Sequence, residues 1–309
     1  MSYIGIDIGG TNTKFGLVSN NGEVLSSESI PTNPVFEELI DSLVGVCQDM
    51  VATSKDKVKG IGIGCPGIVN GLLGIVEYSC NLNWNNVPLR DALQSKLGIE
   101  TRIANDANIA TLGETLYGAG KGYSNAIMLT LGTGVGGGII IDKHIYDGNH
   151  GAGAELGHMV IELGGKKCGC GMHGCLEAYA SAKAFLHETK NAMKENPKST
   201  MWQECGGDIS KVNIFTAFNC YKDKTAKKVV DDYIQYLSTG VLNYCNIFRS
   251  EVVILGGGMS YIGSPLLDQV VSYVKKNNYG YKCSPMVEIK LATLENNAGI
   301  VGGRALFEE

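Results

Sequence analysis

The chain has 309 residues, of which 44% are apolar and 18% charged, and its formal net charge is −5. This composition excludes a disordered chain and is enough to bury the cores of about two domains. Because the sequence has no stripe of lysines and arginines, we expect no nucleic-acid partner.

The sequence also lacks segments that direct a chain to a membrane or out of the cell. Residues 1–10 contain no basic segment followed by an apolar run, so we expect no signal peptide and a cytoplasmic location. The longest uncharged stretch, residues 122–141, is interrupted by glycines. We therefore interpret it as two buried strands around a turn and expect no membrane contact.

The first half of the chain predicts a hairpin followed by helices and strands in alternation. Ile4, Ile6 and Ile8, then Phe15 and Leu17, alternate with other residues on the two sides of a turn at residues 9–12. The elements expected after this hairpin are a strand at 23–30, a helix at 34–52, a strand at 60–64, a helix at 89–96, a strand at 100–104 and a helix at 107–117.

The second half begins in the same way. Strands at 126–131 and 136–141 flank a turn at residues 132–134, and a short strand at 144–146 follows. After a long insertion at 148–223 we expect a helix at 226–248, a strand at 252–255, a helix at 265–275, a strand at 287–292 and a last helix that begins near Asn297.

Two halves that open alike predict two similar α/β domains with a ligand in the cleft between them. We place the smaller domain at residues 1–118 together with a C-terminal helix at 295–309. The larger domain takes residues 119–294.

The first turn, residues 9–12, has the composition of a phosphate-binding loop. Glycine lets the backbone approach a phosphate closely, and side chains around the turn supply donors. Asp7, just before the turn, is suited to hold Mg²⁺ through water. The candidate nucleotide-binding residues are Asp7, Gly9, Gly10, Thr11, Asn12, Thr13 and Lys14. The alternative is a plain hairpin turn.

Two more glycine turns follow apolar strands. The second turn consists of Gly132, Thr133 and Gly134, and the third turn consists of Gly256, Gly257 and Gly258. The second turn offers another phosphate cradle, and the third permits a flat adenine or ribose to lie on the backbone. None of the three turns fits a Rossmann or Walker pattern well, but their repetition favours a nucleotide site.

Asn105 and Asp106 follow the strand at 100–104 and begin a helix. One interpretation is a helix N-cap, for which both residue types are favoured. The functional interpretation places Asp106 at the carboxyl end of a strand, where open α/β sheets bind ligands. A carboxylate there can accept the proton of an attacking hydroxyl.

The insertion carries acidic residues suited to a polyhydroxylated ligand. Glu155 and His158 lie close together in sequence, and Glu177 follows later. Paired acceptors bind sugar hydroxyls because those hydroxyls donate in fixed directions. For either glutamate alone, a solvated surface carboxylate is the alternative.

The ten cysteines fall into two groups. Without an export signal we expect the scattered ones to be reduced thiols; these are Cys47, Cys65, Cys80, Cys205, Cys220, Cys245 and Cys283. Cys168, Cys170 and Cys175 instead form a dense cluster with glycine spacers.

This cluster predicts a structural Zn²⁺ site with four protein ligands, for which we choose His158 as the fourth. His173 is the competing ligand, although its place inside the cysteine loop would strain the site. A free-thiol loop or a disulfide is the alternative to metal binding. The metal would pin the insertion so that the three sugar-binding candidates converge.

Several of these motifs together resemble the ROK family of sugar kinases and repressors, within the actin-like ATPase superfamily. The resemblance covers essentially the whole chain. It rests on D-I-G-G-T at residues 7–11, G-C-P-G at 64–67, N-D-A-N at 105–108, E-L-G-H at 155–158 and C-G-C-G-M-H-G-C-L-E at 168–177.

The resemblance implies two actin-like (ribonuclease H-like) ATPase domains around a central cleft, with a zinc-stabilised insertion. It implies ATP-dependent phosphorylation of a hexose at the 6-hydroxyl, with Mg²⁺ and structural Zn²⁺, by a homodimer. Asp106 would be the general base. The sugar-binding residues would be Gly67, Asn105, Asp106, Glu155, His158 and Glu177, and His158 would bind zinc with one ring nitrogen and sugar with the other.

Within the family, residues 81–84 and 105–114 look most similar to Gram-positive glucokinases, so we expect glucose as the acceptor, with N-acetylmannosamine as the alternative. A sugar-responsive repressor is the rival from another class. Such a protein carries a helix-turn-helix segment ahead of the first turn, and because the first turn lies close to residue 1 we expect no such segment here. A sugar-binding module without catalysis would need neither Asp106 nor two phosphate turns.

Overall fold

The computed structural model describes residues 1–280 and 286–308. Cys283 and the last residue of the predicted segment 295–309 lie outside the described residues. The chain forms two compact units: unit 1 consists of Met1–Ala126, Gly138–Ala154 and Thr293–Glu309, and unit 2 of Ile127–Gly137 and Glu155–Ala292. These limits differ from the proposed domains chiefly at Gly138–Ala154, which the sequence analysis assigns to the second domain.

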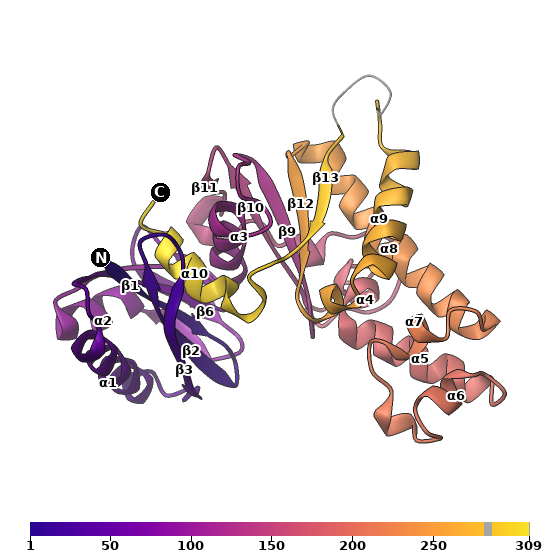
Figure 1. Ribbon diagram of the computed structural model, residues 1–309, viewed down its shortest axis with the longest axis horizontal. Helices are drawn as coiled ribbons and strands as arrows, with labels where there is room; N and C mark the ends of the chain where they lie inside the picture. Colours follow the sequence, from indigo (N-terminus) through magenta and orange to yellow (C-terminus); the bar gives the residue numbers. More distant parts are fainter. Residues whose placement is uncertain (281–285, 309) are drawn as a thin grey trace. The chain divides into compact units, whose positions relative to one another are not determined.

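Unit 1 is built on a mixed sheet with strand order β3-β2-β1-β4-β8, in which β1 runs antiparallel to β2 and parallel to β4 (Figure 1). Its strands are β1 (Ser2–Ile8), β2 (Asn12–Ser19), β3 (Val24–Pro31), β4 (Val58–Cys65) and β8 (Glu100–Asn105). Its helices are α1 (Phe36–Thr53), α2 (Leu89–Leu97), α3 (Asp106–Tyr117) and α10 (Ala298–Ala305). The first turn joins β1 to β2, as predicted.

Alternation along β1 gives the sheet two differently packed faces. Ile4, Ile6 and Ile8 are fully buried in a core that includes Leu39 and Leu43 of α1. Gly5, between Ile4 and Ile6, and Gly62 of β4 leave room for α10 on the opposite face. A Cβ atom added to Gly303 of α10 would lie 2.6 Å from the carbonyl oxygen of Gly62 in β4, so this helix and the sheet touch backbone to backbone.

A small antiparallel sheet that the sequence analysis does not predict follows β4. It has the order β5-β6-β7 and consists of β5 (Ile68–Asn70), β6 (Ile75–Ser79) and β7 (Trp84–Val87). β5 has three residues, fewer than the alternating pattern needs, and the apolar residues of β6 and β7 do not alternate strictly with polar ones.

The second sheet has the order β11-β10-β9-β12-β13. When the five strands of each sheet are numbered in the order in which they occur along the chain, both sheets have the same order, 3-2-1-4-5. Its strands are β9 (Ala126–Leu131), β10 (Val135–Ile141), β11 (His144–Ile145), β12 (Val252–Gly256) and β13 (Glu288–Leu291). The predicted α/β class and the repeated opening hairpin are therefore confirmed.

Unit 2 contains most of the predicted insertion, whose regular elements are helices. Its helices are α4 (Glu177–Ala180), α5 (Ala182–Glu195), α6 (Met201–Glu204), α7 (Thr216–Asn219), α8 (Lys224–Phe248) and α9 (Ser264–Asn277). Short 3₁₀ segments occur at Leu156–His158, Ile209–Lys211 and Gly258–Ile262, and in unit 1 at Asn149–Gly151 and Glu295–Asn297. The long helix α8 buries one face, which includes Tyr233, Leu237, Val241 and Tyr244.

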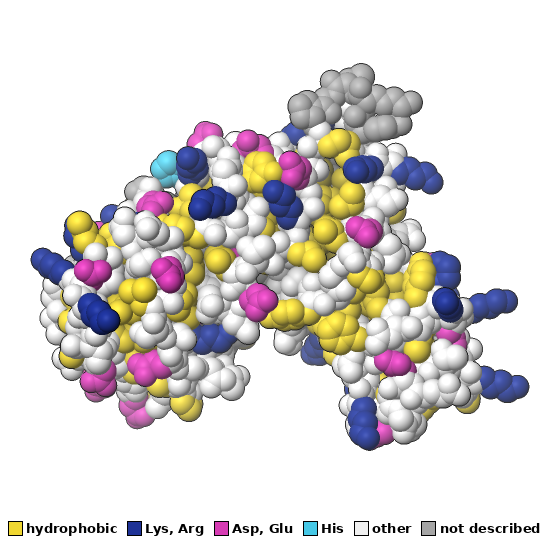
Figure 2. Space-filling model, in the orientation of Figure 1, with side chains coloured by type: hydrophobic (Ala, Val, Ile, Leu, Met, Phe, Trp, Pro, Cys, Tyr) yellow, Lys and Arg dark blue, Asp and Glu magenta, His cyan; other side chains and the backbone are white. Residues whose placement is uncertain are grey.

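In the part of the chain that is described, no helix has both the length and the apolar character needed to cross a bilayer. On the face shown in Figure 2, Lys and Arg side chains are interspersed with acidic and apolar ones.

Candidate functional site

The junction of β8 and α3 places Asp106 at the first position of a helix. Asn105 is the N-cap: its Oδ1 accepts hydrogen bonds from the amides of Ala107 at 2.9 Å and Asn108 at 3.2 Å. The capping interpretation therefore applies to Asn105. Asp106 is the first residue of the helix, and its Oδ1 accepts a hydrogen bond from the Ala107 amide at 2.9 Å.

Asn105 also links this junction to the G-C-P-G segment at residues 64–67, which contains the sugar-binding candidate Gly67. Its Nδ2 donates to the carbonyl oxygen of Gly67 at 3.0 Å. Gly67 has φ +112, and a Cβ there would clash with the backbone of Tyr78 and Ser79. Glycine is therefore required at this position, and this segment and the catalytic candidate are held together within unit 1.

Asp7 and Asp106 share an unfavourable environment for two negative charges. Burial raises the pKa of Asp7 to about 6; the nearby carboxylate of Asp106 adds to this effect, and Lys14 opposes it. Burial also raises the pKa of Asp106, against the lowering effect of the Ala107 amide. Two carboxylates in these surroundings fit the hard oxygen ligands that Mg²⁺ prefers.

The first turn is held by a small hydrogen-bond network. The Gly9 amide donates to the carbonyl oxygen of Asn12 at 3.0 Å, while Gly10 and Thr11 are exposed. Thr13, one of the predicted cofactor-binding residues, lies on the inner side of the turn. Its side chain is fully buried, and its hydroxyl lies 2.9 Å from that of Thr32, which donates to the carbonyl oxygen of Gly9. Thr13 therefore supports the turn from inside, because alternation along β2 points it into the core.

In unit 2 the second and third turns lie against each other and against α5. The third-turn residue Gly257 has φ +77, and a Cβ there would lie 2.6 Å from the amide nitrogen of Leu131. The carbonyl oxygen of Gly132 accepts from the amide of Ala182, the first residue of α5, at 2.8 Å. Three segments far apart in sequence therefore meet beside the second turn.

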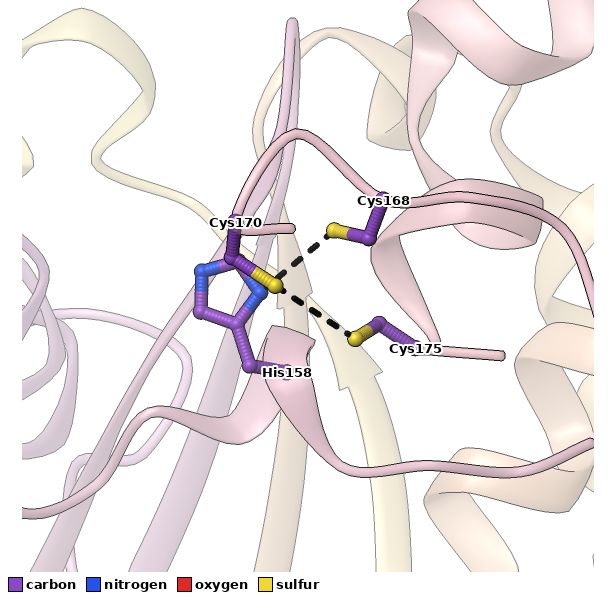
Figure 3. A group of neighbouring side chains, drawn as sticks. All are labelled: His158, Cys168, Cys170 and Cys175. Atoms are coloured by element: carbon purple, nitrogen blue, oxygen red, sulfur yellow. Dashed lines mark hydrogen bonds between the residues drawn. The ribbon is translucent and has the colours of Figure 1, made fainter. Parts of the chain in front are cut away.

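The cysteine cluster comes together with His158, as predicted (Figure 3). The ligand atoms of Cys168, Cys170, Cys175 and His158 all lie within 4.8 Å of one another. Cys170 Sγ is 3.7 Å from Cys175 Sγ, and Cys168 Sγ is 3.7 Å from His158 Nδ1. Bonds of about 2.3 Å in a tetrahedral Zn²⁺ site imply ligand separations of roughly 3.8 Å, so the donor set and its spacing fit zinc.

The competing ligand, His173, lies outside this group. Its Nδ1 is 3.0 Å from the carbonyl oxygen of Gly165, and the residue is exposed. His158 uses Nδ1 toward the cysteines, which leaves Nε2 for another partner.

Two of the predicted sugar-binding residues of unit 2, His158 and Glu177, contact the same cluster. Glu177 Oε1 accepts from Cys168 Sγ at 3.4 Å, and Glu177 Oε2 accepts from the amide of Val135 at 3.1 Å. The Leu156 carbonyl oxygen accepts from the buried hydroxyl of Tyr244. Glu155 remains exposed at the start of this segment. A change in the conformation of the cysteine loop would therefore alter the positions of Glu177 and His158, which both contact Cys168.

Glu114 is a buried acidic residue that the sequence analysis misses. It is 0% exposed, and it accepts from the amides of Ala119 at 2.8 Å, Thr293 at 2.8 Å and Leu294 at 2.6 Å. It thus joins the end of α3 to the chain that leads into α10. Two of its amide partners, Thr293 and Leu294, are distant in sequence, so no sequence motif could have identified it.

Comparisons with known proteins agree with the motifs. A family model described as "ROK family" matches residues 3–309. A glucokinase of Thermotoga maritima is 35% identical over 321 residues, which span 100% of this chain and 98% of that protein. The structure of a ROK family glucokinase from Streptomyces griseus in complex with glucose and AMPPNP matches with a TM-score of 0.82 and 31% identity, and covers 99% of each chain.

The similarity is not confined to kinases. A xylose repressor of Caldicellulosiruptor bescii is 31% identical over 310 residues, which span 97% of this chain and 76% of the repressor. The chemistry of the site is therefore needed to choose between the two activities.

Proposed function

The chain belongs to the ROK family, and on that premise we propose that it transfers the terminal phosphoryl group of ATP to the 6-hydroxyl of glucose. The observation that carries this choice is Asp106: a half-buried carboxylate at a helix start, with a raised pKa, in the segment where a general base is expected. A repressor that only senses a sugar has no need of such a base.

The proposed reaction is an in-line transfer. Asp106 accepts the proton of the 6-hydroxyl as that oxygen bonds to the γ-phosphorus and the bond to ADP breaks. The raised pKa of Asp106 brings its basicity closer to neutral pH, which favours proton transfer. Gly67 and Asn105 would position the sugar in unit 1, and Glu155, His158 and Glu177 would accept or donate to its other hydroxyls.

The donor phosphates are proposed to lie against the first and second turns, where Gly9, Gly10, Thr11, Asn12, Lys14, Gly132, Thr133 and Gly134 supply amides and side-chain donors. Mg²⁺, when bound, would neutralise charge on the phosphates. Asp7 would hold it through water, which also accounts for an acidic residue in an otherwise apolar strand. The third turn, Gly256, Gly257 and Gly258, would receive the adenosine.

Zn²⁺ would be structural, because all four ligands come from the protein. Its thiolate ligands require a reducing environment, and this supports the cytoplasmic location expected from the sequence. A homodimer remains the proposed assembly.

The test is release of ADP by the wild-type protein, with and without glucose, and the same assay on Asp106→Asn. We expect glucose-dependent ADP release and glucose 6-phosphate as the product. Asparagine keeps the oxygen that accepts from Ala107 but removes the base, so kcat should fall by about 10²–10⁴-fold. Glucose binding by calorimetry should stay within a few fold. A near-normal kcat in this variant would refute the role of Asp106, and no ADP release by the wild type would refute the kinase.

A further inference from the structure

The three cysteines of the metal cluster belong to a short antiparallel hairpin, residues 160–175, which we call the cysteine hairpin. Its two sides meet at the isolated bridges Val160–Cys175 and Lys167–His173. Single bridges fix a hairpin less firmly than continuous strands do, because each aligns one residue pair instead of a ladder. Contacts from neighbouring helices therefore matter for where the hairpin lies.

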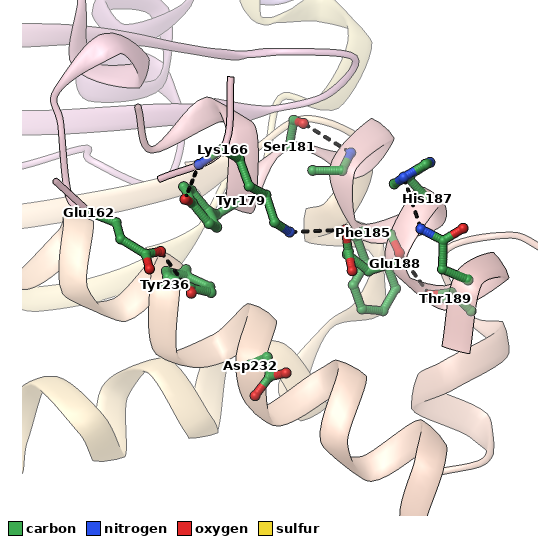
Figure 4. Close-up of polar contacts among 12 residues, drawn as sticks. Glu162, Lys166, Tyr179, Ser181, Phe185, His187, Glu188, Thr189, Asp232 and Tyr236 are labelled. Carbon is green, nitrogen blue, oxygen red and sulfur yellow. Dashed lines mark hydrogen bonds and ion pairs between the residues drawn. The ribbon is translucent and has the colours of Figure 1, made fainter. Parts of the chain in front are cut away.

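Tyr179 makes such a contact. It lies in α4, two residues after Glu177, and is 5% exposed. Its hydroxyl oxygen accepts a hydrogen bond from the Lys166 amide at 2.6 Å (Figure 4). A Cβ atom added to Gly165 would lie 2.1 Å from the same oxygen, so the hairpin and the phenol are in direct contact. One side chain therefore joins the helix that carries Glu177 to the segment that leads into Cys168.

Tyr236 of α8 holds the ring of Tyr179 in place. The two ring centroids are 4.2 Å apart, and the Lys166 ammonium lies 5.0 Å from the centroid of Tyr179. The Tyr236 hydroxyl donates to Glu162 Oε2 at 2.9 Å, so α8 also contacts the hairpin directly (Figure 4). The position of the Tyr179 hydroxyl is thus fixed before any ligand binds.

The same hairpin contacts two proposed sugar ligands. Cys168 Sγ donates to Glu177 Oε1 at 3.4 Å and lies 3.7 Å from His158 Nδ1. The Tyr179 hydroxyl therefore acts on Glu177 along two routes, through the backbone of α4 and through the hairpin. Loss of this hydroxyl would leave both ligands chemically intact but would loosen their positions.

We propose that Tyr179, held by Tyr236, is a positioning residue for the sugar. Its hydroxyl fixes the cysteine hairpin against α4, so that Glu177 and His158 meet the sugar hydroxyls in one arrangement, while Tyr179 itself does not touch the sugar. The inference rests on the proposed function, because it takes Glu177 and His158 as sugar ligands.

The test compares Tyr179→Phe with Tyr221→Phe, a matched loss of a phenol hydroxyl that instead donates to Asp231 Oδ1 at 2.7 Å. We expect Y179F to raise KM for glucose about tenfold, the effect of a backbone amide left without its acceptor. KM for ATP and kcat should stay within about twofold, because weaker binding of substrate and transition state alike changes KM alone. Zinc release to a chromogenic chelator should be about tenfold faster in Y179F, since the same bond holds the cysteine hairpin.

A purely structural role for Tyr179 would lower kcat and leave KM for glucose unchanged, because part of the protein would be inactive, and this result would overturn the inference. It is also overturned if Y179F matches Y221F in KM for glucose or in the rate of zinc release. Failure of the proposed function looks different, because the wild type itself would form no glucose 6-phosphate. Calorimetric Kd values for glucose and the rates of zinc release would then still test Tyr179, since neither measurement needs turnover.

Discussion

At the scale of single residues, Asp7 is an example of a site residue whose charge lowers the stability of the folded protein. Its pKa is raised from the ordinary value of 3.8 to about 6, by burial first and by Asp106 second. Because the folded-state value lies above the unfolded one, its contribution to stability is fully present below pH about 4. That contribution is lost as the pH rises through about 6, where the folded protein has to hold a half-buried carboxylate.

We therefore predict that Asp7→Asn stabilises the ligand-free protein at pH 8 and has little effect at pH 4. The amide keeps the shape of the side chain and removes the charge that faces Asp106. Thermal unfolding of both proteins at the two pH values, without and with Mg²⁺, measures this. Activity should fall, and the stabilisation of the wild type by Mg²⁺ should weaken in the variant. A destabilisation of equal size at both pH values would contradict the electrostatic explanation.

At the scale of elements, the cysteine loop joins two parts of unit 2. The loop contributes Cys168, Cys170 and Cys175, whereas His158 comes from the 3₁₀ segment Leu156–His158 that Tyr244 of α8 holds in place. Glu177 begins α4 directly after the loop and contacts Cys168. Metal binding would thus fix the positions of several proposed sugar ligands at once.

We predict that Cys170→Ser depletes the protein of zinc and lowers its activity. Structural zinc in small peptides contributes about 10–16 kcal/mol of apparent binding free energy, so losing one thiolate should unfold the loop at least locally. Elemental analysis and limited proteolysis would measure this, with the exposed Cys80 replaced by serine as the control. A wild-type preparation that is fully active without zinc would refute the metal site.

Glu114 connects two other elements, the end of α3 and the chain entering α10. All of its amide partners belong to unit 1, and α10 packs against β1 and β4 of the same unit. The Glu114 carboxylate therefore holds residues 293 and 294 at the end of α3, and α10, which follows them, packs on the sheet.

We predict that Glu114→Gln lowers the free energy of unfolding by about 1–3 kcal/mol. The new NH₂ group cannot accept, so at least one of the amides of Ala119, Thr293 and Leu294 loses its partner. Urea unfolding measures the change, and Glu37→Gln, an exposed position on α1, should stay within about 0.5 kcal/mol. An unchanged unfolding free energy in E114Q would show that water or a rearranged backbone replaces these bonds.

At the scale of the whole molecule, the proposed substrate residues are divided between two sheets with the same strand order. Asn105 ends β8 of the first sheet and Asp106 follows it, whereas Glu155, His158 and Glu177 follow the opening hairpin of the second sheet. The preference for glucose rests on the similarity of the whole chain to glucokinases.

We predict that glucose has the highest kcat/KM among glucose, N-acetylmannosamine, N-acetylglucosamine, mannose, allose and fructose. Deoxy sugars should lose about ten- to a hundredfold, because a buried acceptor left unpaired costs on the order of 1–3 kcal/mol. Coupled assays of ADP release over this panel measure the ranking. A value for N-acetylmannosamine ten times that for glucose would overturn the preferred acceptor and leave the kinase intact.

The sequence by itself determined the features that neighbouring residues control. Alternating apolar residues and glycine turns identify both opening hairpins, and the spacing of the cysteines with the choice of His158 identifies the metal cluster. These signals are reliable because side-chain direction in a strand and backbone freedom at glycine are local properties.

Only the tertiary structure decided what depends on packing between distant segments. It assigned Gly138–Ala154 to unit 1, turned the Thr13 hydroxyl into the core, gave Glu114 its three amide partners and brought α5 beside the second turn. None of these leaves a periodic or motif signal, because each is set by which buried surfaces meet and by which polar groups must find partners once water is excluded.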